Sequence, residues 1–247
     1  MSRGERGVAE AGGTPAAGDP HHHADVSGGW LRAATFGAMD GLVTNIALIA
    51  GVGGGGLSPR IIVLTGVAGL TAGAISMGLG EYTSVKTQNE QIGAEVAKER
   101  AELARHPQAE AQELAEMWIA RGLPADLSRQ VAEALKDYPE EALRVHVQEE
   151  LGVSMTDVPS PWVAAFSSFV CFSIGGVIPL LSYLFGSTEL WLALAVGGAG
   201  LFVVGALTAR FTARRWWLAG LRQLMLGGAA AGATYLIGSA IGVDGVT

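Results

Sequence analysis

Carboxylates recur at helical spacing in the middle of the chain, in a pattern suited to binding a cation. The first set has the spacing i, i+4, i+7, and the second repeats every third residue: Glu95, Glu99, Glu102, Glu110, Glu113 and Glu116. Residues three and four apart are neighbours on a helix, so these like charges repel unless a cation lies between them. Oxygen ligands from facing helices suit hard and borderline divalent cations. The alternative is a solvated acidic face whose glutamates pair with Lys98, Arg100 and Arg105.

A later stretch of the same region adds an imidazole to these carboxylates. His146 is followed by Glu149 and Glu150, which places all three within about one helical turn. Imidazole and carboxylate ligands together accept iron, manganese or zinc. We therefore expect this helix to contribute to a metal site with the two acidic helices, subject to the same acidic-face alternative.

Two apolar stretches carry further groups with ligand chemistry. Asp40 lies inside the first stretch and is followed by Thr44 and Asn45. A charged group at bilayer depth costs roughly 2.5–3.5 kcal/mol, so it usually faces a cavity or a partner and marks a transport path. Met77 and Glu81 are four residues apart in the second stretch, and a thioether is a soft ligand that favours transition metals. The alternatives are a structural contact for Asp40 and simple packing for Met77.

Five apolar stretches are each long enough for a transmembrane helix, which needs about 20 residues. They cover about 31–52, 61–82, 162–185, 190–209 and 218–242. Tryptophans lie at their ends, where an indole suits the headgroup level: Trp30, Trp162, Trp191, Trp216 and Trp217. Only 16% of the residues are charged, against about 25% in soluble domains. These patterns predict an all-α membrane protein with five transmembrane helices.

Charge is concentrated between the second and third apolar stretches. Residues 86–157 hold 15 acidic and 8 basic side chains, and turn residues divide the region into four helices at 86–105, 108–121, 125–137 and 140–151. We expect a small bundle whose first two helices run antiparallel. The net charge of −7 argues against nucleic-acid binding, and a single cysteine, Cys171, excludes a disulfide framework.

Lysine and arginine mark the cytosolic side of membrane proteins. With the N-terminus inside, that side holds nearly all the basic residues and the opposite side holds only Arg60. The predicted organisation is a disordered cytosolic tail (1–29), transmembrane helices one and two (30–85), a cytosolic helical metal-binding domain (86–158) and transmembrane helices three to five (159–247). Residues 1–29 show no cleavable signal peptide, and His21, His22 and His23 are interpreted as a flexible tail or tag remnant rather than a metal site.

Glycine spacing adds an expectation about packing. Gly37 and Gly41, like Gly69 and Gly73, are four residues apart. Small residues at this spacing let helix backbones approach closely. We therefore expect tight packing of the first two transmembrane helices, within one protomer or between two.

Two segments of the chain resemble the vacuolar iron transporter family. They are Asp40-Gly41-Leu42-Val43-Thr44 and the run AGAISMGLGEY from Ala72 to Tyr82. The resemblance covers about residues 30–245 and includes the helical insert. It implies export of divalent metal from the cytosol, of Fe²⁺ and often Mn²⁺, in exchange for protons. It also implies a homodimer with the pathway between the first helices of the two protomers, and no enzymatic activity.

The resemblance also implies roles for individual residues. The pathway aspartate falls on Asp40 and the pathway methionine on Met77, while the insert ligands fall on a set of five glutamates: Glu99, Glu102, Glu110, Glu113 and Glu150. Plant members have a further glutamate where this chain has Gly69, and Glu81 would substitute for it from a different height. They also have a methionine pair at His146 and Val147, so the metal selectivity of this chain is expected to differ and Zn²⁺ or Co²⁺ stay open as substrates.

The resulting hypothesis is a proton-coupled transporter whose insert captures Fe²⁺ or Mn²⁺ and whose Glu81, Met77 and Asp40 pass it across the membrane. The alternative is a membrane-anchored metal-binding or ferroxidase protein, in which the insert does the chemistry and the spans anchor it. Heavy use of alanine, glycine and arginine favours a bacterial plasma membrane, and a vacuolar membrane is the alternative in a eukaryote.

Overall fold

The computed structural model describes residues 29–155, 158–210 and 214–242, and within them the chain is entirely helical. The described part contains no strand. Residues 1–28, including His21, His22 and His23, lie outside it. The eight helices follow in this order: α1 (Gly29–Gly54), α2 (Pro59–Arg105), α3 (Pro107–Ala120), α4 (Ala125–Leu135), α5 (Pro139–Glu150), α6 (Pro161–Leu184), α7 (Leu190–Thr208) and α8 (Trp216–Ile241).

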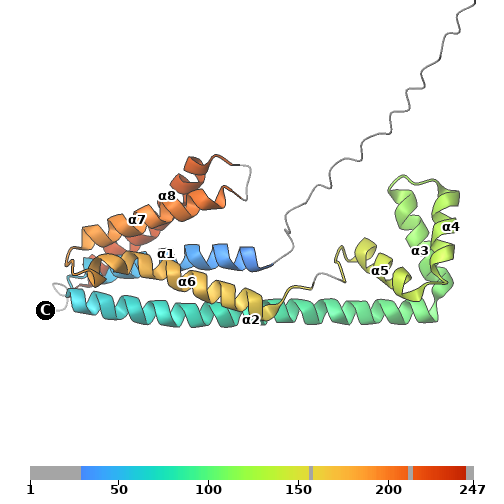
Figure 1. The fold of residues 1–247 in the computed structure, drawn as a ribbon, viewed down its shortest axis with the longest axis horizontal. Helices are drawn as coiled ribbons and strands as arrows, with labels where there is room; N and C mark the ends of the chain where they lie inside the picture. The colour runs from blue at the N-terminus through green and yellow to red at the C-terminus, as the bar shows by residue number, and fades with distance from the viewer. Residues whose placement is uncertain (1–28, 156–157, 211–213, 243–247) are drawn as a thin grey trace, which may run out of the picture.

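Five of these helices are long and apolar enough to cross a membrane, namely α1, α2, α6, α7 and α8. They coincide with the five predicted stretches to within a few residues, because hydropathy and flanking turn residues act locally. α2 is the exception in length, since its 47 residues span about 70 Å. Its first half is the apolar stretch, and its second half from Lys86 onward is charged and projects beyond the other spans (Figure 1).

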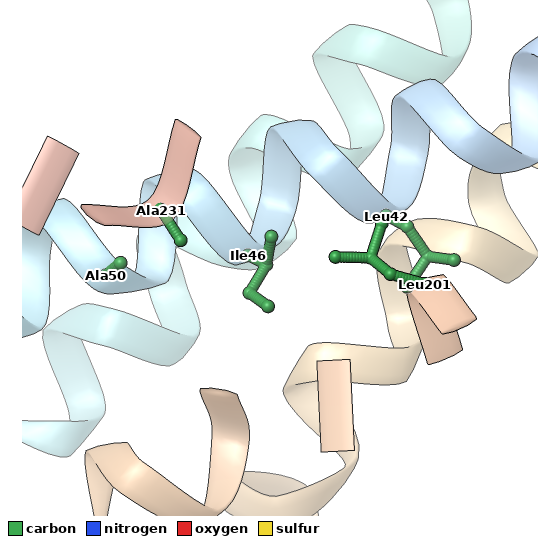
Figure 2. Close-up of a cluster of buried hydrophobic side chains, with 5 residues drawn as sticks. All are labelled: Leu42, Ile46, Ala50, Leu201 and Ala231. Carbon is green, nitrogen blue, oxygen red and sulfur yellow. The ribbon is translucent and has the colours of Figure 1, made fainter. Parts of the chain in front are cut away.

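The five long helices pack around α1. This helix contacts α2, α6, α7 and α8, and no other helix among the described residues touches all four of these partners. Figure 2 shows part of this core, in which side chains of α1, α7 and α8 meet: Leu42, Ile46, Ala50, Leu201 and Ala231. A second buried cluster around Ile49, Ile62 and Leu180 joins α1, α2 and α6.

Glycines allow close contacts between the long helices, and one of these contacts joins α1 to α6. At Gly41, an added Cβ would run into the carbonyl oxygen of Phe172 on α6, and at Gly175 into the carbonyl oxygen of Ala38 on α1. The glycine face of α1 is thus used against α6, and Gly73 on α2 also faces the Phe172 ring. Between the first two spans, a glycine of α2 provides the close approach, since a Cβ added at Gly69 would come 2.9 Å from the Leu48 side chain of α1. The expected contact between these spans is therefore present within the protomer, but Gly37 and Gly41 of α1 face α6 instead of α2. Spacing identifies a face for close packing but not the helix that fills it.

The helices α3, α4 and α5 form the charged insert between the second and third candidate spans. α3 leaves the end of α2 steeply and packs mainly against α4, while α5 returns toward the charged half of α2 (Figure 1). The expected antiparallel pairing of the first two insert helices is therefore not seen. Only His106 separates α2 from α3, and helix pairs that reverse direction use a loop of about two to five residues.

Several contacts mark the level where α2 leaves the bundle. Ala33, Val85 and Ala164 form a small buried cluster, and the rings of Tyr82 and Trp162 lie 4.7 Å apart. One helical turn further along α2, Asn89 donates a hydrogen bond to the carbonyl oxygen of Pro159 at 2.9 Å. The start of α1, the start of α6 and the middle of α2 therefore lie at one level.

Candidate metal sites

The insert brings three of the predicted ligands together. Glu99 of α2, Glu110 of α3 and His146 of α5 each offer an atom within 4.8 Å of the others. The His146 Nδ1 atom lies 3.2 Å from Glu99 Oε1 and 3.8 Å from Glu110 Oε2. The His146 side chain is 2% exposed and each glutamate side chain 13%. Three separate helices thus deliver nitrogen and oxygen donors to one buried point.

The closest pair in this cluster is not satisfied by hydrogen bonding. Glu99 Oε1 and His146 Nδ1 are both buried and neither makes a hydrogen bond, despite their short separation. Buried polar atoms without a hydrogen bond are uncommon, and an ion is one of their explanations. The donor set of two carboxylates and one imidazole suits iron, manganese or zinc.

The protonation of the cluster follows from burial. Burial is the largest cause that raises the pKa of Glu99 to about 7, and the charge and hydrogen bond of Glu150 contribute less to the same shift. Burial also raises the pKa of Glu110, to which the charges of Glu113 and Glu150 add. Burial lowers the pKa of His146 against an opposing effect of Glu150. At neutral pH the imidazole is therefore uncharged, which is the form that binds a metal.

Three more predicted ligands lie around the cluster rather than within it. The charges of Glu113 and Glu150 act on Glu99, and that of Glu102 acts on Glu110. Glu113 and Glu150 are exposed, and Glu102 already lies 3.6 Å from the Arg105 guanidinium. They make the neighbourhood negative, and a cation at the centre would lower their mutual repulsion.

The remaining insert candidates have other partners. Glu95 pairs with Lys98 at 2.7 Å, and Glu116 accepts a hydrogen bond from Gln112 at 2.8 Å. Glu149 accepts a hydrogen bond from the Trp118 indole and forms an ion pair with Arg121. These contacts give the three carboxylates structural roles at other points of the insert, as the acidic-face alternative expects.

Asp40 lies roughly 17 Å from the start of α1, near the middle of a bilayer core about 30 Å thick. Thr44 donates a hydrogen bond to its Oδ1 atom at 3.4 Å. Phe36, Asp40 and Thr44 are four residues apart and form one face of α1, with Phe36 and Thr44 exposed and Asp40 half-buried. The other helices of the chain therefore leave this face largely uncovered.

Asn45 points into the bundle instead. Its side chain is buried and donates a hydrogen bond from Nδ2 to the carbonyl oxygen of Gly176 on α6, while its Oδ1 atom has no hydrogen-bond partner. Asn45 therefore joins two helices directly, beside the Asp40 face rather than on it.

Glu81 has a partner, Arg32, that was not predicted from the sequence. Its buried carboxylate accepts a hydrogen bond from the Arg32 guanidinium at 2.8 Å, and the Arg32 side chain itself is 64% exposed. Met77, one turn earlier on α2, is half-buried. The sequence does contain a pattern that could predict this ion pair. Arg32 lies in the first turn of the first span and Glu81 near the end of the apolar stretch of the second, so the two charges lie at the same membrane level.

Taken together, these features define a class: a multi-span α-helical membrane protein with candidate metal ligands in both its spans and its insert. Comparison with known proteins narrows the class. A model of the VIT family matches residues 31–239, and the chain belongs to this family.

Relatives of the chain share most of its length. It is 30% identical to vacuolar iron transporter 1 of Oryza sativa subsp. japonica, over 94% of this chain and 97% of the relative. It is 29% identical to vacuolar iron transporter 1 of Eucalyptus grandis, over 90% and 91% of the two chains. Identity reaches 35% with the vacuolar iron transporter of Acanthamoeba castellanii, over 66% of this chain and 59% of the relative. These names agree with the expectation that the chain is a transporter and not an enzyme.

Proposed function

We propose that this protein is a proton-coupled transporter that moves Fe²⁺, with Mn²⁺ as a second substrate, out of the cytosol. The observation that carries the proposal is the position of Asp40, a carboxylate at mid-membrane depth on a largely uncovered face of α1. Such a group is expensive to expose to lipid and typically marks an ion path. The names of the relatives supply iron as the substrate.

The uncovered Asp40 face also supports a homodimer. Lipid would leave the charge of Asp40 unsolvated, whereas the same face of a second protomer would enclose it. A twofold axis beside α1 would then bring two Asp40 residues and two Thr44 residues to one pathway, with membrane lipid around the outer helices. The half-buried Met77 offers a thioether from the adjacent α2, which favours a transition metal over Mg²⁺ or Ca²⁺.

The insert captures the ion before it enters the pathway. Glu99, Glu110 and His146 form the centre of the capture site, and Glu102, Glu113 and Glu150 add negative charge around it. Glu99 follows Glu81 by 18 residues of α2, or about 27 Å. An ion bound in the insert is therefore too far away for direct transfer to the spans, and capture and entry are separate steps.

Glu81 lies where the second step would begin. A metal ion that reaches this carboxylate replaces Arg32, whose exposed side chain can move into solvent. A proton and a metal ion then compete for Asp40, because a carboxylate binds metal only in its deprotonated form. Protons arriving from the far side release the ion there.

The distribution of charge supports the direction of transport. The insert, the N-terminal segment and the arginines between α7 and α8 all belong to the side rich in basic residues, which is the cytosolic side of a membrane protein. The segments 1–29, 30–85, 86–158 and 159–247 would then be a tail, two spans, a cytosolic metal-binding domain and three spans. The relatives' names favour a vacuolar membrane, and a bacterial plasma membrane would preserve the same orientation.

Metal uptake into proteoliposomes tests the proposal. The wild-type protein should carry Fe²⁺ and Mn²⁺ faster when a pH gradient is present, and Asp40→Asn should abolish uptake of both. Asp126→Asn, on an exposed helix of the insert, is the matched control and should transport normally. If Asp40→Asn protein still moves Fe²⁺ at the wild-type rate, or if the wild type consumes oxygen in the presence of Fe²⁺ without uptake, the proposal is wrong.

A further inference from the structure

We propose that a groove between the end of α7 and the start of α8 binds an anionic phospholipid. The groove has a volume of about 560 Å³ and combines apolar side chains of α7, including Val203 and Leu207, with three arginines: Arg210, Arg214 and Arg215. Trp216 completes it and meets the Phe202 ring edge-on, with ring centroids 6.1 Å apart. This site is independent of the transport pathway proposed above.

Among the described residues, no carboxylate neutralises the three arginines of the groove. None forms an ion pair with another described residue, whereas insert arginines such as Arg100 and Arg121 pair with glutamates. Between residues 158 and 242 the chain has one acidic residue, Glu189, at the opposite end of α7 and about 28 Å away. A partner for this positive charge must therefore come from outside this part of the chain.

The walls of the groove are apolar and partly exposed. Val203 and Leu207 are about half exposed, on a helix that is apolar throughout. They face the acyl-chain region if α7 spans the membrane, and the arginines then lie where α7 ends, at the headgroup level. Trp216 is 60% exposed beside them, as expected of an interfacial indole.

The unpaired arginines and the apolar walls together identify the chemical class of the ligand. Guanidinium groups bind phosphate oxygens in a bidentate manner, and basic pockets between transmembrane helices bind anionic headgroups. An anionic phospholipid supplies both a phosphate for the arginines and an acyl chain for the apolar wall. Free phosphate would satisfy only the arginines, and a zwitterionic lipid carries its own positive charge next to the phosphate.

The test is lipid retention by the full-length protein, measured by native mass spectrometry after addition of phosphatidylglycerol or phosphatidylcholine. The wild type should retain phosphatidylglycerol at least about tenfold more than phosphatidylcholine, by analogy with the roughly 1 kcal/mol that each basic residue contributes near an anionic surface. The triple variant Arg210→Gln, Arg214→Gln, Arg215→Gln should lose this preference. Arg60→Gln, at the other end of the spans, is the matched control and should keep it.

A second variant separates the contribution of the apolar wall from that of the arginine charges. Leu207→Trp fills the apolar wall without removing an arginine, so it should release phosphatidylglycerol while the protein stays folded. Equal retention of the two lipids by the wild type, retention by the triple variant, or full displacement of the lipid by inorganic phosphate would each overturn the proposal. A further measurement uses the wild type alone. Its thermal stability should be higher in phosphatidylglycerol nanodiscs than in phosphatidylcholine nanodiscs, which would support the proposal.

Discussion

Glu81 and Glu99 both lie on α2, yet the surroundings of their carboxylates differ in charge. Arg32 provides Glu81 with a positive partner at 2.8 Å. Glu99 instead faces the uncharged imidazole of His146 and further carboxylates, so burial and repulsion raise its pKa to about 7. A proton or a metal ion can relieve this repulsion, and at neutral pH the two compete. The insert site is therefore sensitive to pH in the range where cells work.

The first residue-scale prediction concerns this competition. Metal binding requires the Glu99 carboxylate, and with a pKa of about 7 the deprotonated fraction rises about tenfold between pH 6 and pH 8. The affinity of the insert for Mn²⁺ should rise by about the same factor, as measured by calorimetry on the full-length protein. Glu99→Gln should bind more weakly and with a flatter pH profile, whereas Glu141→Gln on α5 should follow the wild type. An affinity that falls as the pH rises would contradict the assignment.

Ionisation of Glu99 also has a consequence for metal-free protein. The pKa of this carboxyl in the folded chain lies above its ordinary value of 4.5. The folded state therefore holds the proton more tightly than the unfolded state, and the group costs stability progressively as the pH rises from about 4.5 to about 7. Bound metal offsets this loss.

The second residue-scale prediction concerns Arg32. Arg32→Gln leaves the buried Glu81 carboxylate without its positive partner, so the metal-free protein should unfold at a lower temperature. If a divalent ion can take the place of Arg32, Mn²⁺ should raise the unfolding temperature of this variant more than that of the wild type. The double variant Arg32→Gln, Glu81→Gln should lose the additional stabilisation by metal. An equal effect of Mn²⁺ on all three proteins would show that Glu81 binds no metal.

At the scale of helices, α1 is held by backbone contacts that only glycine allows. Gly41 meets the Phe172 backbone and Gly175 meets the Ala38 backbone, so α1 and α6 approach more closely than side chains would permit. Lipid gives no hydrophobic advantage to helix association, and close van der Waals packing takes its place. The neighbouring face of α1, which carries Phe36, Asp40 and Thr44, is left toward the outside of the protomer.

A methyl group at this contact should therefore be costly. Gly41→Ala should destabilise the protein by about 1–3 kcal/mol, because the colliding atom is a backbone oxygen that cannot rotate away. Gly80→Ala on α2 is the matched control, since an added Cβ there meets nothing within 4 Å. Thermal unfolding followed by size-exclusion chromatography compares them. Equal stability of the two variants would contradict the close α1–α6 contact.

At the scale of the whole molecule, one long helix joins two chemically different parts. α2 carries the proposed pathway residues Met77 and Glu81 near its middle, and Glu99 of the proposed capture site lies about 27 Å further along the same helix. The two parts share no ligand among the described residues. Damage to the capture site and damage to the pathway should therefore have different kinetic effects.

Transport kinetics test this separation. Glu99→Gln combined with Glu110→Gln should raise the metal concentration needed for half-maximal transport and leave the maximal rate nearly unchanged, because saturating metal bypasses capture. Glu141→Gln is the control on the same insert and should change neither value. Loss of transport by the double variant even at saturating metal would show that the ion must pass through the insert.

The amino-acid sequence predicts the helices of this protein better than it predicts which candidate ligands come together. The spans and the insert helices were predicted to within a few residues, because apolar runs, prolines and glycines act over one or two turns. Glu99, Glu110 and His146, which the structure brings together, were all among the predicted ligands. The same prediction also included Glu95, Glu116 and Glu149, which have other partners. Helical spacing places all these carboxylates on helix faces without saying which faces meet.

The amino-acid sequence by itself determined the helices, the apolar and charged regions, and the residue types able to bind a metal, since each depends on neighbours along the chain. The tertiary structure decided that His146 meets Glu99, that Arg32 rather than solvent neutralises Glu81, and that the glycines of α1 pack against α6. The first two contacts join residues 47 and 49 positions apart, and the third joins helices separated by the whole insert. They depend on how whole helices pack, which local periodicity does not specify.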